Sequence, residues 1–169
     1  IKLGDKISSI KRDVSSILDN ISTKPYSNWE QPVSNIAIIV YLLYKCNIRI
    51  GNKKYAREFG SYGATTLHKK HIKITNNPNK VIIEFIGKKG VFNKSELNNP
   101  KLVSIFQKLK NNRPDFLFKY KNSGGTSLIT SEHITNYLKK FNADLVPKMF
   151  RTWYANHYFL EKLRKDYQK

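Results

Sequence analysis

Residues 48–72, which read IRIGNKKYAREFGSYGATTLHKKHI, decide the fold of this chain. Arg49 follows an apolar stretch that predicts a helix, and the glycines at 51, 60 and 63 allow two turns around a basic and aromatic segment. The β-branched residues that follow predict a strand over 64–67. A protein that grips a phosphodiester needs a planar guanidinium for bidentate contact and a flexible backbone beside it. The segment therefore favours phosphate binding.

The net charge narrows the choice of partner. The chain of 169 residues has 31 Lys and Arg against 12 Asp and Glu, which gives a net charge of +19. A nucleic acid, an anionic membrane surface or an acidic protein could balance such a charge. The most apolar stretch, Ile36–Tyr44, is much shorter than the ~20 residues of a spanning helix, so a membrane partner is disfavoured. The length suits one compact domain or a piece of a larger protein.

Apolar spacing predicts the helices. Isoleucine, valine and leucine at 7, 10, 14, 17 and 18 follow the period of an amphipathic helix, and a polar, proline-marked break covers 23–29. Pro32 begins a second helix to about Cys46, apolar nearly all round and therefore central to the core. Cys46 is then a buried structural thiol rather than a reactive one. Further helices are expected over 102–109, from a cap at Ser131 through Tyr137 and Phe141, and from Pro147 onward.

Strand signals are confined to the middle of the chain. Besides 64–67, strands are expected over 71–75 and 81–86, followed by a tight GKKG turn and a return strand beginning VF. Residues 122–126, NSGGT, predict a loop. The expected fold class is α+β and mostly α, with helices packed around a small three-stranded antiparallel sheet.

Three segments carry a family resemblance. Residues 48–72, FIGKKGV at 85–91 and PKMFRTWYAN at 147–156 resemble, in this order, segments of type IB DNA topoisomerases, both poxvirus-like and cellular. The resemblance implies the catalytic-core fold shared with tyrosine recombinases. It also implies that residues 1–169 are a partial catalytic domain, lacking an N-terminal DNA clamp domain and a C-terminal segment with the nucleophilic tyrosine.

The resemblance assigns three catalytic residues. Arg49 and Arg151 match the arginines that hold the scissile phosphate, and Lys88 matches the lysine that protonates the 5′-oxygen leaving group. Spacing alone also allows non-catalytic roles for these residues. Arg49 could be a solvated arginine at a helix C-terminus, Lys88 a solubilising charge, and Arg151 the partner of a carboxylate. Lys89 rivals Lys88 as the general acid. The expected DNA contacts are Lys53, Lys54, Tyr55, Thr66, Lys89 and Lys148, while His71 could either touch DNA or face the sheet.

No nucleophile is assigned. Tyr154, Tyr158 and His157 belong to the Arg151 helix, and Tyr167 lacks the surrounding motif of the family. The rest of the polypeptide is expected to supply the tyrosine and a histidine or lysine.

The implied function is transient nicking and religation of one strand of duplex DNA through a 3′-phosphotyrosyl intermediate, which relaxes supercoils. No ATP, metal or other cofactor is expected. The protein is expected to be a monomer inside the cell, in the nucleus or in a viral factory or virion. The sequence lacks zinc-ligand spacing and a Walker motif. A tyrosine recombinase or integrase core, or a basic DNA-binding module without catalysis, are the alternatives.

Overall fold

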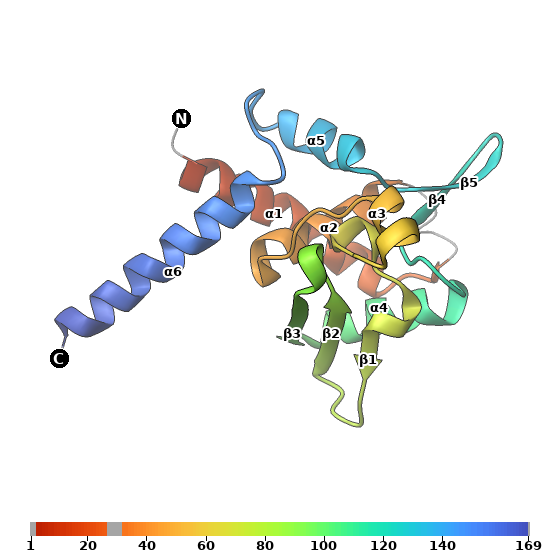
Figure 1. Ribbon diagram of the computed structural model, residues 1–169, viewed down its shortest axis with the longest axis horizontal. Coiled ribbons are helices and arrows are strands. Elements are labelled where there is room, and N and C mark those ends of the chain that lie inside the picture. The colour runs from red at the N-terminus through yellow and green to blue at the C-terminus, as the bar shows by residue number, and fades with distance from the viewer. Residues whose placement is uncertain (1–2, 27–31, 169) are drawn as a thin grey trace.

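The computed structural model describes residues 3–26 and 32–168. Figure 1 shows helices surrounding a small sheet, with one long helix extending away from the body. The helices are α1 (Leu3–Ser22), α2 (Pro32–Cys46), α3 (Lys53–Phe59), α4 (Pro100–Asn112), α5 (Ser131–Lys139) and α6 (Met149–Tyr167). The strands are β1 (Ile72–Ile74), β2 (Lys80–Ile86), β3 (Phe92–Asn98), β4 (Lys119–Asn122) and β5 (Gly125–Leu128). Short 3-10 turns are η2 (Ala64–Thr66), η3 (Lys69–His71) and η4 (Lys88–Gly90).

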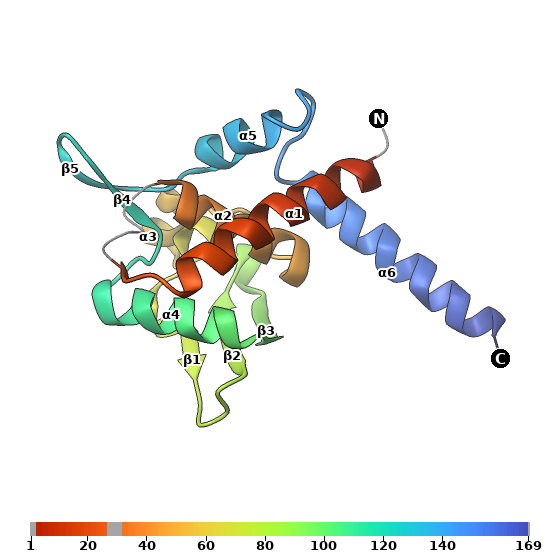
Figure 2. The ribbon, with the colours of Figure 1, turned by 180° about the vertical axis from the view of Figure 1, so that it is seen from behind.

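Helix α2 forms the centre of the core, as its sequence predicts. Every residue from Ser34 to Tyr44 is buried, and α2 contacts α1, α5 and α6. The apolar stripe of α1 packs against it, with Ile10 and Val14 fully buried. In Figure 2 α1 faces the viewer and crosses the body from beside the first turns of α6 toward α4. Helix α1 ends at Ser22, and the predicted break over 23–29 lies partly outside the described residues.

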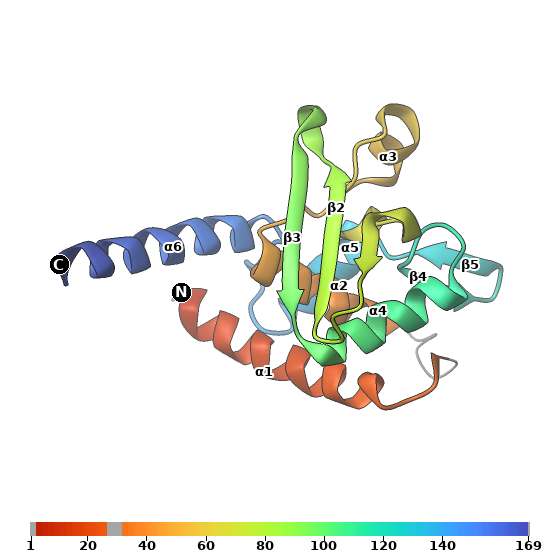
Figure 3. The same ribbon diagram turned by 90° about the horizontal axis from the view of Figure 1, so that it is seen from below.

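The three-stranded antiparallel sheet is confirmed, and its strands correspond to the predicted strands over 71–75 and 81–86 and to the predicted return strand after the GKKG turn. The order is β1-β2-β3, and Ile83 pairs with Ile72 on one side and Ser95 on the other. Alternate residues of β2 (Val81, Ile83 and Phe85) are buried, because period-2 alternation turns one face of the strand to the core. The return strand after the GKKG turn runs the full length of β2, and Figure 3 shows this hairpin rising beside α3.

The predicted strand over 64–67 is wrong, since residues 64–66 form the 3-10 turn η2. Their backbone hydrogen bonds go to the Arg49 segment: Ala64 N donates to Arg49 O at 2.8 Å and Thr65 N to Ile50 O at 2.8 Å. The propensity of threonine for strands is therefore overridden by a local tertiary contact. Residues 122–126 are likewise more than a loop, because they include the turn of the β4–β5 hairpin.

Two helix boundaries also differ from the prediction. Thr130, not Ser131, is the N-cap of α5, and its backbone N–H donates to His133 Nδ1 at 3.0 Å. Helix α5 ends at Lys139 and does not reach Phe141. In the part of the chain that the structure describes, no helix combines the length and apolar character that crossing a membrane requires.

Candidate active site

Three separate segments converge on one cationic cavity. A cavity of about 680 Å³ is lined by the Arg49 segment, the η4 turn, the start of α6 and one face of α3. A smaller cavity of about 280 Å³ adjoins it and shares several of its lining residues. Arg49, Lys88, Lys89 and Arg151 line both cavities. The structure thus brings together the three residues predicted to be catalytic.

Arg49 is held by a close approach of two glycines. Gly51 has a φ of +88°, and a Cβ on Gly63 would lie 2.4 Å from the Cα of Gly51. This contact leaves no room for a side chain at either position, so glycine is required. The Gly63 backbone N–H also donates to Thr66 Oγ1 at 2.9 Å. These contacts fix the backbone of Arg49 while its side chain remains exposed.

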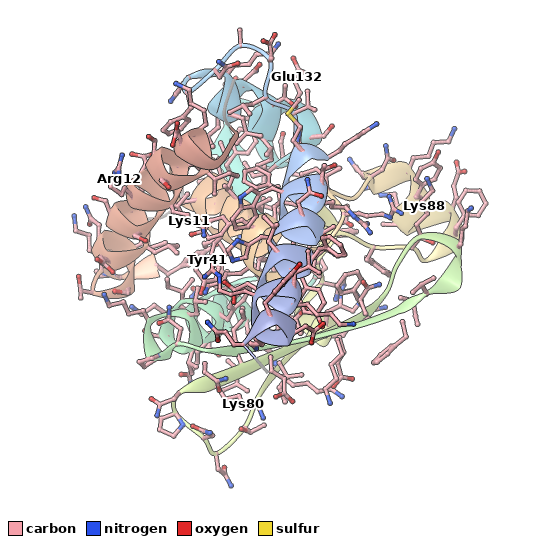
Figure 4. The ribbon with its side chains drawn as sticks, turned by 90° about the vertical axis from the view of Figure 1, so that its left-hand side faces the viewer. Lys11, Arg12, Tyr41, Lys80, Lys88 and Glu132 are labelled. Atoms are coloured by element: carbon pink, nitrogen blue, oxygen red, sulfur yellow. The ribbon has the colours of Figure 1, made fainter. Side chains whose placement is uncertain are left out.

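Lys88 is presented by a rigid hairpin turn. Gly87 N donates to Val91 O at 2.7 Å, and Asn93 Nδ2 donates to the same carbonyl at 3.0 Å. Lys89 adopts a left-handed φ of +62°, which is uncommon for a residue with a side chain. The turn is tied to the Arg49 segment because Tyr62 N donates to Ile86 O at 2.9 Å. Figure 4 labels Lys88 on the side of the molecule that carries this hairpin and α3, with Arg12 projecting from α1 on the opposite side.

Arg151 enters the cavity from the first turn of α6. That turn is anchored by the buried Phe150, whose ring lies 6.4 Å from the ring of Tyr44. The ammonium of Lys11 on α1 lies 4.6 Å from the centre of the Trp153 ring. Such cation–π contacts contribute roughly 0.5–2 kcal/mol. The start of α6 is therefore fixed against α1 and α2.

The electrostatics of this region favour an anion. Burial, and then the charge of Arg49, lower the pKa of Arg151 from its ordinary value. Among residues 3–26 and 32–168, no carboxylate lies within ion-pair distance of either guanidinium. The predicted alternative, an Arg151 paired to a carboxylate, is therefore not what the described residues show. Preorganised cations without internal partners stabilise negative charge that develops on a bound group.

The other predicted contacts are divided between two grooves. Tyr55, Lys89 and Lys148 line the large cavity with Arg49. Lys53 and Lys54 instead line a neighbouring groove of about 560 Å³, together with Arg57. Thr66 lines the same groove as Lys53 and Lys54, but its side chain is buried and its hydroxyl accepts a hydrogen bond from the Gly63 N–H at 2.9 Å, which gives it a structural role.

Three further residues of this region were not singled out from the sequence. Tyr62 lines both cavities, Asn93 lines the smaller one and Phe59 lines the larger one. Tyr62 and Phe59 both belong to the segment over 48–72, where the spacing of Tyr55 and Phe59 on one helix face was the available signal. No sequence pattern distinguishes Asn93.

His71 is buried beside Tyr62, a residue that lines both cavities. Its ring is buried, lies 4.4 Å from the ring of Tyr62, and accepts a hydrogen bond at Nδ1 from His68 N at 2.9 Å. Burial, followed by the charges of Lys70 and His68, lowers the pKa of His71 to about 4. Of the two predicted roles for this histidine, the one facing the sheet is the one the structure supports.

Because His71 is neutral in the folded protein, we expect the folded state to lose stability in acid. A lowered folded-state pKa contributes stability that is present above the unfolded-state pKa of about 6.5 and lost as pH falls toward 4. We expect the free energy of unfolding to fall by about 2 kcal/mol between pH 7 and pH 4.5. Urea unfolding at both pH values measures this. A His71→Asn variant, which keeps an acceptor for His68 N, should lose most of the pH dependence in this window; an unchanged dependence would contradict the assignment. The lowered pKa of His68 acts in the same pH window, so part of the dependence should remain in the variant, whereas the lowered pKa values of Asp115 and Glu96 act at lower pH.

The tyrosines of α6 lie apart from the cationic cavity. Tyr158 and Tyr167 are 66% and 90% exposed, and neither they nor Tyr154 line the cavities described above. Among the described residues, no group of three or more His, Cys, Asp or Glu side chains could hold a metal ion.

Comparison with known proteins identifies the family. The family model for the catalytic core of eukaryotic DNA topoisomerase I matches residues 2–169. The chain is 28% identical to DNA topoisomerase 1B of Acanthamoeba polyphaga mimivirus over 99% of its own length and 50% of that protein. It is 30% identical to DNA topoisomerase 1 of Candidozyma auris over 92% of its length and 19% of that protein. The DNA topoisomerase 1 of Daucus carota is 24% identical over 90% of the chain and 18% of the relative.

The chain belongs to the family of the type IB topoisomerase catalytic core. It spans about half the length of the mimivirus relative and about a fifth of the two cellular relatives.

Proposed function

We propose that this chain provides the cationic half of a type IB topoisomerase active site. The observation that carries the proposal is the shared cavity of Arg49, Lys88 and Arg151, which come from three different segments. The proposed substrate is duplex DNA, whose phosphates complement the net charge of +19. Residues 1–169 would act within a larger catalytic unit, since the nucleophilic tyrosine and a further histidine or lysine are proposed to come from outside the chain.

The proposed reaction exchanges one phosphodiester for another. A tyrosine hydroxyl releases its proton to solvent and its oxygen attacks the phosphorus, so that a 3′-phosphotyrosyl bond forms and the bond to the 5′-oxygen breaks. Arg49 and Arg151 would hold the non-bridging oxygens, where negative charge increases in the transition state. Lys88 would give a proton to the departing 5′-oxygen and take it back during religation. The proposal needs no ATP, because the bond energy is conserved in the phosphotyrosyl link, and no metal, because the arginines and Lys88 offset the developing negative charge.

Binding should depend steeply on salt. Each phosphate neutralised by a protein cation contributes about −0.9 to the slope of log K against log salt, so about six to ten contacts predict a slope of about −5 to −9. Fluorescence anisotropy of a labelled duplex, titrated with the chain at several salt concentrations, measures the slope. The Lys88→Ala variant should reduce its magnitude by about 1. Affinity that is indifferent to salt would contradict the proposed DNA-binding role.

A basic module that binds DNA without catalysis remains the second candidate, because the net charge alone would support it. The two functions differ in what the arginines contribute. In the module, Arg49 and Arg151 would add only two of many phosphate contacts, whereas in the enzyme they would act mainly on the rate of cleavage. A tyrosine recombinase is disfavoured because the matching family is that of topoisomerase I.

A further inference from the structure

The hairpin that carries Lys88 extends beyond the rest of its sheet. Strand β1 pairs with residues 81–83 of β2, whereas β3 pairs with β2 along its whole length. In the described sheet, the end of β2 next to the turn therefore has a strand neighbour on one side only. A two-stranded hairpin is only marginally stable by itself, so the position of its turn depends on local contacts. One such contact, from Tyr62 N to Ile86 O, connects the last residue of β2 to the Arg49 segment.

The side-chain amide of Asn93 closes the turn. Val91 O accepts two hydrogen bonds, one from Gly87 N at 2.7 Å and one from Asn93 Nδ2 at 3.0 Å. A Cβ on Gly87 would lie 2.6 Å from Asn93 Nδ2, so the amide lies directly against the residue that precedes Lys88. The Asn93 side chain therefore contacts both ends of the turn.

The strand register gives Asn93 a position that suits an apolar residue. Asn93 pairs with the buried Phe85, and it lies on the same face of β3 as the buried Leu97, because side chains alternate along a strand. An apolar side chain would pack on this face, but only a side chain with a donor can bond to Val91 O. The half-buried amide also lines the smaller cavity together with Lys88.

Lys88 depends on this turn for its position. Its side chain is exposed, and its ammonium is carried on a flexible four-carbon stem. A general acid must come within hydrogen-bond reach of the leaving oxygen, and a misplacement of about 1 Å can cost about 10²-fold in rate. The next two residues, Lys89 and Gly90, have left-handed φ values of +62° and +74°. A left-handed residue with a side chain persists only where surrounding contacts hold it.

We propose that Asn93 is a positioning residue, whose hydrogen bond to Val91 O fixes the turn so that the Lys88 ammonium reaches the 5′-oxygen leaving group. Asn93 itself transfers no proton and forms no bond to phosphorus in this proposal. It acts on the rate through Lys88 alone. The inference rests on the proposed function, in which Lys88 is the general acid.

Replacing the leaving oxygen with sulfur tests the proposal. The substrate is duplex DNA with a bridging sulfur in place of the 5′-oxygen, at a cleavage site mapped with the parent protein, and it is compared with the same duplex containing oxygen. A thiol is a far stronger acid than an alcohol, so the thiolate departs without a proton. In the full-length protein, Asn93→Ala should slow single-turnover cleavage of the oxygen DNA by about 10- to 100-fold. Cleavage of the sulfur DNA should stay within about threefold of the parent rate, because it no longer needs the general acid.

Further variants separate the hydrogen bond from the bulk of the side chain. Lys88→Ala should show the same pattern as Asn93→Ala, whereas Arg151→Ala should stay slow on both DNAs, because the non-bridging oxygens remain in the sulfur substrate. Asn93→Leu keeps the bulk without a donor and should be as slow as Asn93→Ala on the oxygen DNA. Asn93→Gln keeps an amide donor and should recover part of the rate.

Asn122→Ala is the matched control. Asn122 also stabilises a hairpin turn, since its Oδ1 accepts a hydrogen bond from Gly124 N at 3.0 Å, but it lines none of the cavities described above. This variant should keep the parent rate on both DNAs. The melting temperatures of Asn93→Ala and Asn122→Ala should stay within about 4 °C of the parent value, since each variant loses only exposed hydrogen bonds.

Equal slowing of Asn93→Ala on the oxygen and sulfur DNAs would overturn the inference, because Asn93 would then act on binding, attack or folding rather than through Lys88. An unchanged rate on the oxygen DNA, or a parent-like rate for Asn93→Leu, would overturn it as well. Failure of the proposed function gives a different result. The parent protein would then cleave neither DNA, or Lys88→Ala would cleave both at the parent rate.

Discussion

Arg49→Ala and Arg151→Ala should each slow strand cleavage by the full-length protein by about 10²- to 10³-fold, the loss typical of removing one donor from a charge-stabilising site. Both side chains line the same cavity, and neither has a carboxylate partner among residues 3–26 and 32–168. Each guanidinium is therefore available to a phosphate. The measurement is the rate at which a labelled strand becomes linked to protein on denaturing gels.

Duplex affinity should change much less than the cleavage rate in these variants. Either arginine supplies only one of several phosphate contacts, so a loss of less than about tenfold is expected. Arg49→Lys should fall between parent and alanine variant, because lysine keeps the charge but not the bidentate fork. Arg12→Ala, on α1 and far from Lys88 in Figure 4, is the matched control and should retain the parent rate. Equal losses of affinity and rate would instead assign the two arginines to DNA binding rather than to the chemical step.

Residues 1–169 alone should neither nick nor relax supercoiled plasmid. The cations can stabilise a transition state, but an attacking group must also be present. The α6 tyrosines lie outside the cationic cavity, and none of them matches the position of the nucleophile in the family motif. Loss of one member of a catalytic unit removes nearly the whole chemical advantage. Plasmid incubated with the chain and resolved on denaturing gels should show no protein-linked nicks.

Robust relaxation by the isolated chain would refute that expectation. Mass spectrometry of the protein-linked strand would then identify the nucleophile, and Tyr55 and Tyr62 would be the first to test because both line the cavity. Full-length protein assayed in parallel is the positive control. Recovery of cleavage on adding a downstream C-terminal piece would support the proposal that the tyrosine comes from outside these residues.

Local patterns were sufficient to predict most elements. The 3- and 4-residue apolar spacing of α1 indicated a helix with one buried face, and the continuous apolar run of α2 indicated a helix buried nearly all round. The alternation in β2 and the glycines of the GKKG turn likewise predicted the hairpin that carries Lys88. The resemblance then named Arg49, Lys88 and Arg151 as residues that should act together.

Tertiary contacts decided the features that no local pattern specifies. Residues 64–66 have strand propensity but form a 3-10 turn, because the approach of Gly63 to Gly51 places their N–H groups against the Arg49 segment. The same contact buries the Thr66 side chain, whose hydroxyl accepts a hydrogen bond from the Gly63 N–H. The placement of Phe59 and Tyr62 in the cavity of Arg49 depends on how α3, the hairpin and α6 pack. Such placement follows from contacts between distant segments, whereas periodicity reports only which face of an element is buried.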